Sequence, residues 1–235
     1  MSLQNFRARV ADYKQWSPRY QSIHLELVEP HRIEFVAGQY IMLKVPGVVG
    51  VRQYSIASAP SMDHGLELLA DIVPGGKGSA YLAKLKPGDT VEFMAPAGAF
   101  VINDEPQLLF VATGSGIAPI KSMITDLLVD KKDTRQMWLY WGMRHPEDIF
   151  WFDNFARLAE EYENLYFDMV LSQPKPGWEL CQGRVTDCLR THEHKWDGAK
   201  MGAYICGNRK MIEEVQGWLL TQGVDEQRIH HEQFY

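Results

Sequence analysis

Cysteine is scarce in this chain of 235 residues, and its few cysteines are not spaced as metal ligands. There are three, Cys181, Cys188 and Cys206, an odd number without a C-x-x-C pair. The pattern predicts neither a disulfide framework nor a cysteine-ligated zinc or iron–sulfur site. We therefore expect no resident metal ion.

Long apolar runs and an excess of positive charge are also missing. No segment approaches the roughly 20 apolar residues of a membrane-spanning helix, and residues 1–13 are polar with no apolar stretch behind them. The 24 basic and 30 acidic residues give a net charge of −6, without a Lys or Arg run that suits nucleic acid or an anionic membrane. With 46% hydrophobic residues, the composition predicts a folded cytoplasmic protein that has neither partner.

The first hundred residues alternate apolar and polar positions in short runs between turn residues. Ile23, Leu25 and Leu27, for example, are separated by His24 and Glu26. Period-two alternation indicates half-buried strands. Five further strands are expected over residues 6–14, 40–45, 52–57, 66–73 and 90–95, with one short helix over 79–85. About six short strands of this kind predict an antiparallel Greek-key β-barrel.

The pattern changes after Pro106, where a continuous apolar run over 108–112 indicates a strand buried on both faces. Helical and strand segments then alternate, which predicts a parallel α/β domain. The expected strands are 108–112, 137–141, 165–171 and 203–206, and the expected helices lie near 120–128, 152–162, 185–190 and 210–222. We predict two domains, 1–102 and 107–235, joined by a short linker.

Two glycine-rich turns precede helices and are candidate phosphate sites. Residues 113–119, Thr-Gly-Ser-Gly-Ile-Ala-Pro, follow the first buried strand, and glycines there let backbone amides approach a diphosphate. The full G-x-G-x-x-G fingerprint is absent, so a simple tight connection is an equal alternative. Residues 75–79, Gly-Gly-Lys-Gly-Ser, form the second turn, with Ser79 suited to the N-cap. The alternative there is a flexible hairpin loop.

Together with Arg52-Gln53-Tyr54-Ser55, these turns resemble the ferredoxin–NADP reductase family, whose flavin domain carries an R-x-Y-S motif before a glycine-rich phosphate loop. Other matching features follow in the family's order: residues 38–40, Gly-Gln-Tyr; residues 113–119; Cys206-Gly207; and Glu232 beside a terminal aromatic. The chain looks most like short bacterial reductases and the reductase components of oxygenases. The resemblance implies an FAD-binding Greek-key barrel followed by a pyridine-nucleotide domain.

The resemblance implies how the flavin is held. Arg52 would pair with the diphosphate, Tyr54 would lie along the ring face, and Ser55 would offer its hydroxyl to the N5 edge. The diphosphate would be held from the other side by Gly76, Lys77, Gly78 and Ser79. The alternatives are a surface ion pair for Arg52 and plain burial of Tyr54 or Ser55 by strand alternation. FAD is preferred to FMN, although FMN stays open.

In the second domain, the resemblance assigns the NAD(P) diphosphate to Thr113, Gly114, Ser115, Gly116 and Ile117. Gly142 and Arg144 would approach the adenosine ribose, where an arginine suits a 2′-phosphate, but the choice between NADPH and NADH stays open. Further candidates, each with ordinary surface roles as the alternative, are Ser172, Lys175 and Arg184.

The resemblance also implies four catalytic residues: Ser55, Cys206, Glu232 and Tyr235. Cys206, with Gly207 after it, would lie near the nicotinamide C4, although a buried core cysteine is the alternative. Glu232 would join Ser55 in relaying a proton, rather than being a solvated tail charge. Tyr235 would stack on the flavin and move aside for nicotinamide, whereas such a tail residue is otherwise frayed.

The implied activity is that of an FAD-dependent NAD(P)H oxidoreductase. Hydride would pass to FAD, and single electrons would then go to a separate carrier, a ferredoxin or flavodoxin, because the chain has no ferredoxin-type cysteine run. The alternatives are a redox sensor or electron-transfer subunit without turnover, and a flavin reductase that releases reduced flavin. A basic cluster, which could meet an acidic partner or guard a strand edge, contains Arg7, Arg9, Lys14 and Arg19.

Overall fold

Two units make up the chain in the computed structural model, which describes residues 2–191 and 196–234. One unit consists of residues 1–102 and 121–131, and the other of residues 103–120 and 132–235. Residues 121–131, which fall in the second predicted domain, therefore group with the first unit. The predicted limits of 1–102 and 107–235 stay a prediction.

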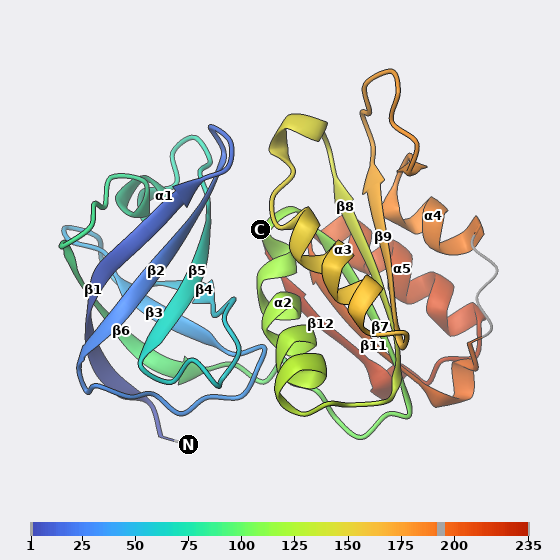
Figure 1. Cartoon of the computed structure of the whole chain (residues 1–235), viewed down its shortest axis with the longest axis horizontal. Coiled ribbons are helices and arrows are strands. Elements are labelled where there is room, and N and C mark those ends of the chain that lie inside the picture. The colour runs from blue at the N-terminus through green and yellow to red at the C-terminus, as the bar shows by residue number, and fades with distance from the viewer. Residues whose placement is uncertain (1, 192–195, 235) are drawn as a thin grey trace. The chain divides into compact units, whose positions relative to one another are not determined.

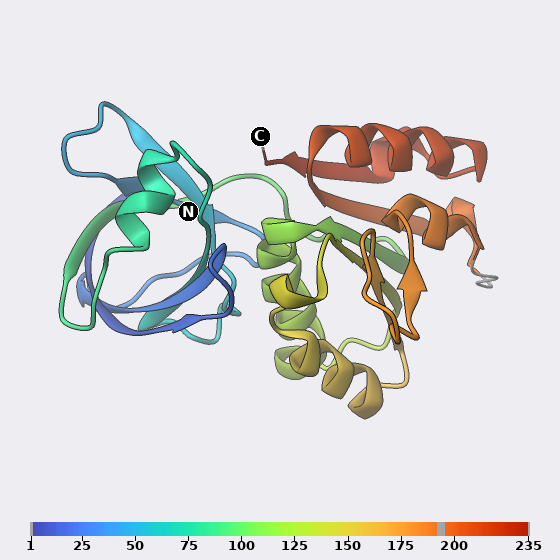
Figure 2. The ribbon, with the colours of Figure 1, turned by 90° about the horizontal axis from the view of Figure 1, so that it is seen from above.

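The first unit is built on a curled, six-stranded antiparallel sheet (Figure 1, Figure 2). The strand order is β4-β3-β6-β1-β2-β5, and β6 returns to lie between β1 and β3, as a Greek-key connection does. An isolated bridge between Ile56 and Leu68 joins the chain after β4 to β5, at the opposite end of the order. All six expected strands are present: β1 (Gln4–Gln15), β2 (Tyr20–Glu29), β3 (Tyr40–Lys44), β4 (Val51–Ser55), β5 (Gly65–Asp71) and β6 (Thr90–Ala97).

Strand alternation sets the core of this sheet. On β2, the side chains of Ile23, Leu25 and Leu27 are buried, whereas His24 and Glu26 are exposed. Each buried aliphatic side chain of this size stabilises the fold by about 1.5–3 kcal/mol relative to an exposed one. The one helix of this region, α1 (Lys77–Leu82), starts two residues before the expected position.

Three of the four residues of the predicted basic cluster pair with neighbouring carboxylates, whereas Lys14 lies over the Trp16 ring. Arg9 Nη2 lies 2.7 Å from Glu26 Oε2, and Arg19 Nε lies 2.7 Å from Asp71 Oδ1. Arg7 pairs in the same way with Glu29. The strand-edge interpretation does not hold for Arg7 and Arg9, because β1 pairs there with both β2 and β6, but beyond Arg9 the register joins β1 to β2 alone. These paired charges give little support to an acidic partner at this place.

The second unit is built on a six-stranded sheet in which every strand pair is parallel. Its order is β10-β9-β8-β7-β11-β12. The strands are β7 (Gln107–Thr113), β8 (Gln136–Met143), β9 (Leu165–Leu171), β10 (Cys181–Gln182), β11 (Met201–Gly207) and β12 (Ile229–Gln233). The prediction found β7, β8, β9 and β11 but missed the two edge strands. The predicted fold class, an antiparallel barrel domain followed by a parallel α/β domain, is confirmed.

Helices cover both faces of the parallel sheet. The helix α3 (Phe152–Glu161) lies on one face, and α4 (Val185–Thr191) and α5 (Arg209–Thr221) lie on the other (Figure 2). The strand residues 108–112 are at most 1% exposed, as a strand buried on both faces requires. A further helix, α2 (Ile117–Thr125), continues into a π-helical turn over Asp126–Asp130. Within residues 2–191 and 196–234, no helix is both long and apolar enough to cross a membrane.

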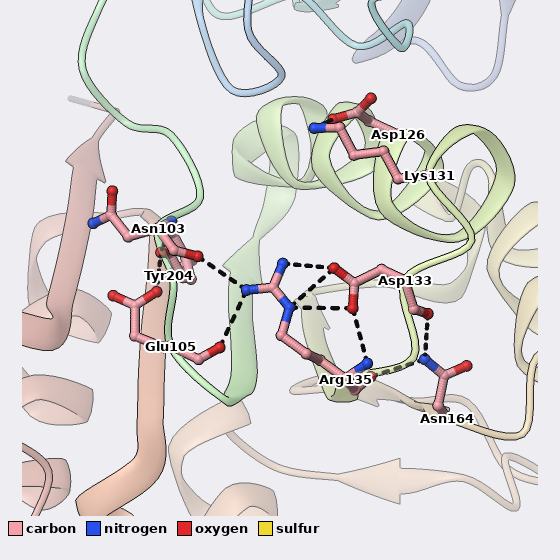
Figure 3. Close-up of polar contacts among 8 residues, drawn as sticks. All are labelled: Asn103, Glu105, Asp126, Lys131, Asp133, Arg135, Asn164 and Tyr204. Atoms are coloured by element: carbon pink, nitrogen blue, oxygen red, sulfur yellow. Dashed lines mark hydrogen bonds and ion pairs between the residues drawn. The ribbon is translucent and has the colours of Figure 1, made fainter.

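The segment before β7 is fixed to the second unit by a polar network (Figure 3). The buried carboxylate of Glu105 accepts a hydrogen bond from the Tyr204 hydroxyl at 2.8 Å, and its other oxygen lies 2.9 Å from His230 Nε2. The Tyr204 hydroxyl accepts from the backbone N–H of Asn103. Arg135 donates to the carbonyl oxygens of Asn103 and Glu105. The first residues after the barrel are thereby held against the start of the parallel sheet.

A disulfide joins Cys181 on β10 to Cys188 on α4, whose Cα atoms lie 6.3 Å apart. The prediction of no disulfide is therefore wrong for this pair. The two residues are only seven positions apart in the chain, and it is the packing of α4 beside the edge strand that brings their sulfur atoms together. Cys206 is free and buried.

Candidate functional site

In the first unit, the two predicted flavin motifs lie against each other. A Cβ atom added to Gly78 would lie 2.6 Å from the Tyr54 hydroxyl oxygen and 3.0 Å from Arg52 Cγ. The glycine at 78 is therefore required by the side chains of β4, and the start of α1 lies directly over Arg52 and Tyr54. The fold therefore brings the R-x-Y-S motif and the glycine-rich turn into contact, although they are far apart in the sequence.

The glycine-rich turn before α1 differs in one respect from the prediction. The N-cap is Gly76 and not Ser79, because helical geometry already begins at Lys77. The Ser79 hydroxyl donates instead to the Gly76 carbonyl oxygen at 3.2 Å. Gly75 has a φ of +77°, which explains a glycine there. No side chain caps the first turn of α1. The backbone N–H groups of that turn can therefore donate hydrogen bonds to a ligand at this end of the helix.

The cations beside this turn have no carboxylate partners among the described residues. Arg52 donates a hydrogen bond to the Val51 carbonyl oxygen at 2.9 Å and makes no ion pair there. Lys77 is exposed and is likewise unpaired within residues 2–191 and 196–234. The surface ion pair that was the alternative for Arg52 is therefore not formed. Two cations, three glycines and uncapped amides together fit a diphosphate.

The remaining residues of the R-x-Y-S motif occupy different environments. Gln53 is exposed and donates to the Tyr40 hydroxyl at 3.0 Å. Tyr54 is half-buried against the barrel core, whereas Ser55 is 5% exposed. β4 ends at Ser55, and two residues later the Ala57 N–H donates to Glu67 on β5. The chain thus passes from pairing with the β3 side, where the Ile56 N–H still donates to the Gln39 carbonyl oxygen, to pairing with β5 just after the motif.

In the second unit, the turn after β7 packs directly on the end of β11. A Cβ atom on Gly116 would lie 2.5 Å from the carbonyl carbon of Cys206 and 2.8 Å from the nitrogen of Gly207. Gly207, with a φ of +145°, in turn leaves room for Thr113, whose nitrogen would lie 3.0 Å from an added Cβ. Because both residues are glycines, the turn after β7 and the end of β11 pack directly against each other. This is the carboxyl edge of the sheet, where open α/β sheets bind their ligands.

Two residues that the sequence interpretation missed hold this turn. Asn208 donates through its side-chain and backbone N–H groups to Thr113 Oγ1, at 3.0 and 3.2 Å, while its Oδ1 caps α5 by accepting from Met211. Trp141 Nε1 donates to the Gly114 carbonyl oxygen at 3.1 Å. An asparagine immediately before a helical segment is an N-cap signal, so Asn208 could have been found. Nothing in the sequence pattern signals the bond from Trp141.

The β8 end lies beside the same turn. A Cβ on Gly142 would lie 3.2 Å from Val185 Cβ and 3.3 Å from Thr113 Cγ2, so a larger residue would press on both. Arg144 follows and is exposed, with no carboxylate partner in the described part of the chain. Two other predicted cations are already paired. Lys175 lies 3.1 Å from Glu147, and Arg184 lies 3.1 Å from Glu214. Arg144 is therefore the better candidate for an external phosphate.

Cys206 and Glu232 occupy paired positions on neighbouring strands, β11 and β12. Cys206 is fully buried, and this burial raises the pKa of its thiol, with the Glu232 carboxylate adding to the effect. The sulfur is therefore protonated and neutral at physiological pH, which suits a small packing group and excludes a nucleophilic thiolate. The Phe234 N–H donates to the Gly207 carbonyl oxygen at 2.8 Å, which continues the pairing beyond β12. The predicted lid residue Tyr235 lies outside the described residues.

The predicted site residues thus form two groups. Arg52 to Ser55 and Gly76 to Ser79 belong to the first unit, and the others belong to the second. Each group contains a glycine, Gly78 in the first and Gly116 in the second, at which an added Cβ would clash with neighbouring side chains or backbone, so each turn packs closely on the strand beside it; we call these two turns the first and second glycine cradle. The pairing of Ser55 with Glu232, which belong to different units, stays a prediction.

Comparisons with known proteins agree with this division. A family model described as an oxidoreductase FAD-binding domain matches residues 7–102, and one described as an oxidoreductase NAD-binding domain matches residues 110–217. The two matches confirm the predicted cofactors, FAD and NAD(P)H. They contain all the predicted cofactor-binding residues.

The relatives include proteins of two kinds. The chain is 34% identical to the reductase component of phenol 2-monooxygenase from Pseudomonas sp. strain CF600, over 99% of this chain and 66% of that protein. It is 31% identical to ferredoxin–NADP reductase B of Sorangium cellulosum, over 97% of each. The crystal structure of the Amycolatopsis cytochrome P450 reductase GcoB has a TM-score of 0.88 and 30% identity, over 99% of this chain and 70% of that one. The chain spans 66% of the length of the first relative.

Proposed function

Because the chain belongs to the ferredoxin–NADP reductase family of FAD- and NAD-binding oxidoreductases, we propose that it moves electrons from reduced nicotinamide through FAD to a separate one-electron carrier protein. The family resemblance predicted from the R-x-Y-S motif is confirmed by these matches. The observation that supports the proposed activity best is the pair of glycine cradles, one in each unit, each shaped by the side chains or backbone packed against it. A two-step electron path needs a binding site for each cofactor.

The first cradle would hold FAD. Arg52 and Lys77 would neutralise the diphosphate, since neither has a carboxylate partner among the described residues, and the amides at the start of α1 would donate to its oxygens. Tyr54 would pack along the ring. When bound, FAD supplies an acceptor for a hydride and a donor of single electrons.

The second cradle would hold the dinucleotide. Thr113 to Ile117 would present backbone amides to its diphosphate, and the bonds from Asn208 and Trp141 hold this turn in place before the ligand arrives. Arg144 would lie at the adenosine ribose. An unpaired guanidinium there suits the 2′-phosphate of NADPH, which makes NADPH our first choice of donor.

Four residues would act at the reacting groups of the two cofactors: Ser55, Cys206, Glu232 and Tyr235. The neutral Cys206 side chain would shape the space for the nicotinamide without competing for the hydride. The Glu232 carboxyl group would carry a proton, with the Ser55 hydroxyl as its hydrogen-bonding partner. Tyr235 would cover the ring until the nicotinamide displaces it.

The acceptor would be a separate protein. One relative is named as a reductase component of an oxygenase and another as a ferredoxin–NADP reductase, and both names describe proteins that hand electrons onward. A ferredoxin or flavodoxin is our first choice. We also propose that the protein acts in the cytoplasm, as the sequence predicts.

A two-part experiment tests this function. The purified protein is first passed through gel filtration, and its FAD content is measured before and after. It is then given NADPH without oxygen together with a ferredoxin, a flavodoxin or free flavin, and the reduction of each acceptor is followed by absorbance. Retained FAD with fast reduction of a carrier protein supports the proposal. Loss of flavin with reduction of free flavin alone would identify a flavin reductase instead.

A further inference from the structure

The Cys181–Cys188 disulfide lies in a part of the nucleotide unit that the proposed reaction does not use. It ties the two-residue edge strand β10 to α4, and it closes a loop over residues 182–187. β10 also pairs with the last residues of β9, and the Cys181 carbonyl oxygen accepts a hydrogen bond from Trp178 Nε1 at 3.1 Å. The disulfide is therefore the one covalent constraint on this loop among several non-covalent ones in the described residues.

The closed loop reaches the edge of the sheet at which the dinucleotide would bind. The Gly183 N–H donates to the carbonyl oxygen of Leu171, the last residue of β9, at 2.9 Å. Val185 is the residue that an added Cβ on Gly142 would meet at 3.2 Å. Gly142 itself borders Thr113 at the start of the phosphate turn. A shift of the loop would thus reach the predicted nucleotide residues through a single intervening side chain.

The two sulfur atoms differ in access from the third cysteine. Cys181 is half-buried, whereas Cys188 is only 3% exposed, so Cys181 is the more accessible residue of the pair. Cys206 is fully buried, and its raised pKa makes it a poor partner for exchange. Exchange chemistry would be confined to one pair, with Cys181 attacked first.

We propose that Cys181 and Cys188 are a reversible thiol–disulfide site that controls the affinity of the second unit for NADP+ or NAD+. With the bond intact, residues 183–185 are held at the nucleotide edge and affinity is high. With the bond reduced, the loop samples positions away from that edge. If the competent position is then populated about one fifth of the time, the apparent Kd rises about fivefold. The identity of the ligand rests on the proposed function.

The redox step balances with a small-molecule disulfide as the oxidant. The Cys181 thiolate attacks that disulfide, which forms a mixed disulfide and releases one small thiol. The Cys188 thiolate then attacks the Cys181 sulfur, which forms the internal bond and releases the second small thiol. Two electrons and two protons pass from the protein dithiol to the small molecule. A small dithiol reverses the sequence.

The test compares the FAD-loaded protein in its two redox states. Thiols are counted by mass after alkylation in denaturant, and one is expected in the oxidised state and three in the reduced state. The Kd values for NADP+ and NAD+ are then measured by calorimetry in each state. We expect a rise of about fivefold on reduction for whichever nucleotide binds. The double variant C181S/C188S should match the reduced protein and ignore dithiothreitol.

The outcomes separate this inference from the proposed function. Equal Kd values in the two thiol states, with nucleotide bound in both, would overturn the switch and leave the reductase proposal intact. Three thiols in protein treated with oxidised glutathione would overturn it as well, since the pair would not close. Binding of neither nucleotide in either state would overturn the proposed function and the switch together.

Discussion

Replacing Gly116 by alanine should damage the nucleotide site and leave the flavin site intact. The backbone at Gly116 is not in the left-handed region, so alanine is conformationally allowed and the added methyl group alone is the perturbation. Its Cβ would lie 2.5 Å from the carbonyl carbon of Cys206 and 2.8 Å from the Gly207 nitrogen. These are backbone atoms of β11, which is paired on both sides, so they have little freedom to yield.

The expected cost follows from this overpacking. Inserting a methyl group into a well-packed site costs about 1–3 kcal/mol. We expect the free energy of unfolding to fall by about that amount, measured by urea denaturation, and the Kd for NADP+ to rise by about tenfold or more as the phosphate turn moves off β11. FAD content should match the parent protein, because the flavin residues belong to the other unit.

A matched control is available on α5. Gly217 lies inside the helix, and an added Cβ there meets nothing within 4 Å. Gly217→Ala should therefore stabilise the protein by about 0.5–1 kcal/mol, the usual gain for alanine over glycine in a helix, with nucleotide affinity unchanged. If Gly116→Ala kept parental stability and parental Kd, the interlock between the phosphate turn and β11 would be refuted.

Three further variants test other parts of the account. Gly78→Ala should lower FAD affinity and spare NADP+ binding, because its Cβ would displace the Tyr54 hydroxyl 2.6 Å away; unchanged FAD retention on gel filtration would contradict this. Tyr204→Phe should cost about 1–3 kcal/mol in urea unfolding, since it removes the hydrogen bond that the buried Glu105 carboxylate accepts through Oε2 and the one that the Asn103 N–H donates; a loss below a few tenths of a kcal/mol would argue against the network. Glu105→Gln should change how the free energy of unfolding depends on pH in acid. Burial opposes ionisation of Glu105, but hydrogen bonds from His230 and Tyr204 hold its pKa below the ordinary 4.5. The contribution of this depressed pKa is complete above 4.5 and is lost as the pH falls through the folded-state value, so the stability difference between parent and variant should shrink in acid. A stability difference between parent and variant that stayed constant with pH would refute this role of Glu105.

The regular elements could be predicted because their signals are local. Alternation over Ile23, Leu25 and Leu27 is enough to place β2, and the apolar run 108–112 is enough to place a strand buried on both faces. The two glycine-rich turns, which we propose hold the diphosphates, were also expected before helices from their glycines, and each does precede a helix. In each case, the physical constraint acts on neighbouring residues in the chain.

The features that were missed depend on distant contacts. The middle of β12 has the sequence His-His-Glu, which shows no apolar alternation. Its pairing with β11 is what identifies it as a strand. The Cys181–Cys188 bond depends on where α4 packs. The N-cap of α1 is Gly76 and not the expected Ser79, and Gly78 in its first turn packs against Arg52 and Tyr54 of β4. No local pattern carries that information.

The proposed reaction requires this chain to accept electrons from a reduced nicotinamide onto bound flavin. The most direct measurement is an anaerobic stopped-flow experiment in which the purified protein is mixed with NADPH or, separately, NADH, while the visible flavin absorbance is followed. The account predicts rapid bleaching, with NADPH the more efficient donor and with this preference reduced in Arg144→Ala. A flavin that stays oxidised with both donors would contradict the account and would favour a sensor or binding subunit.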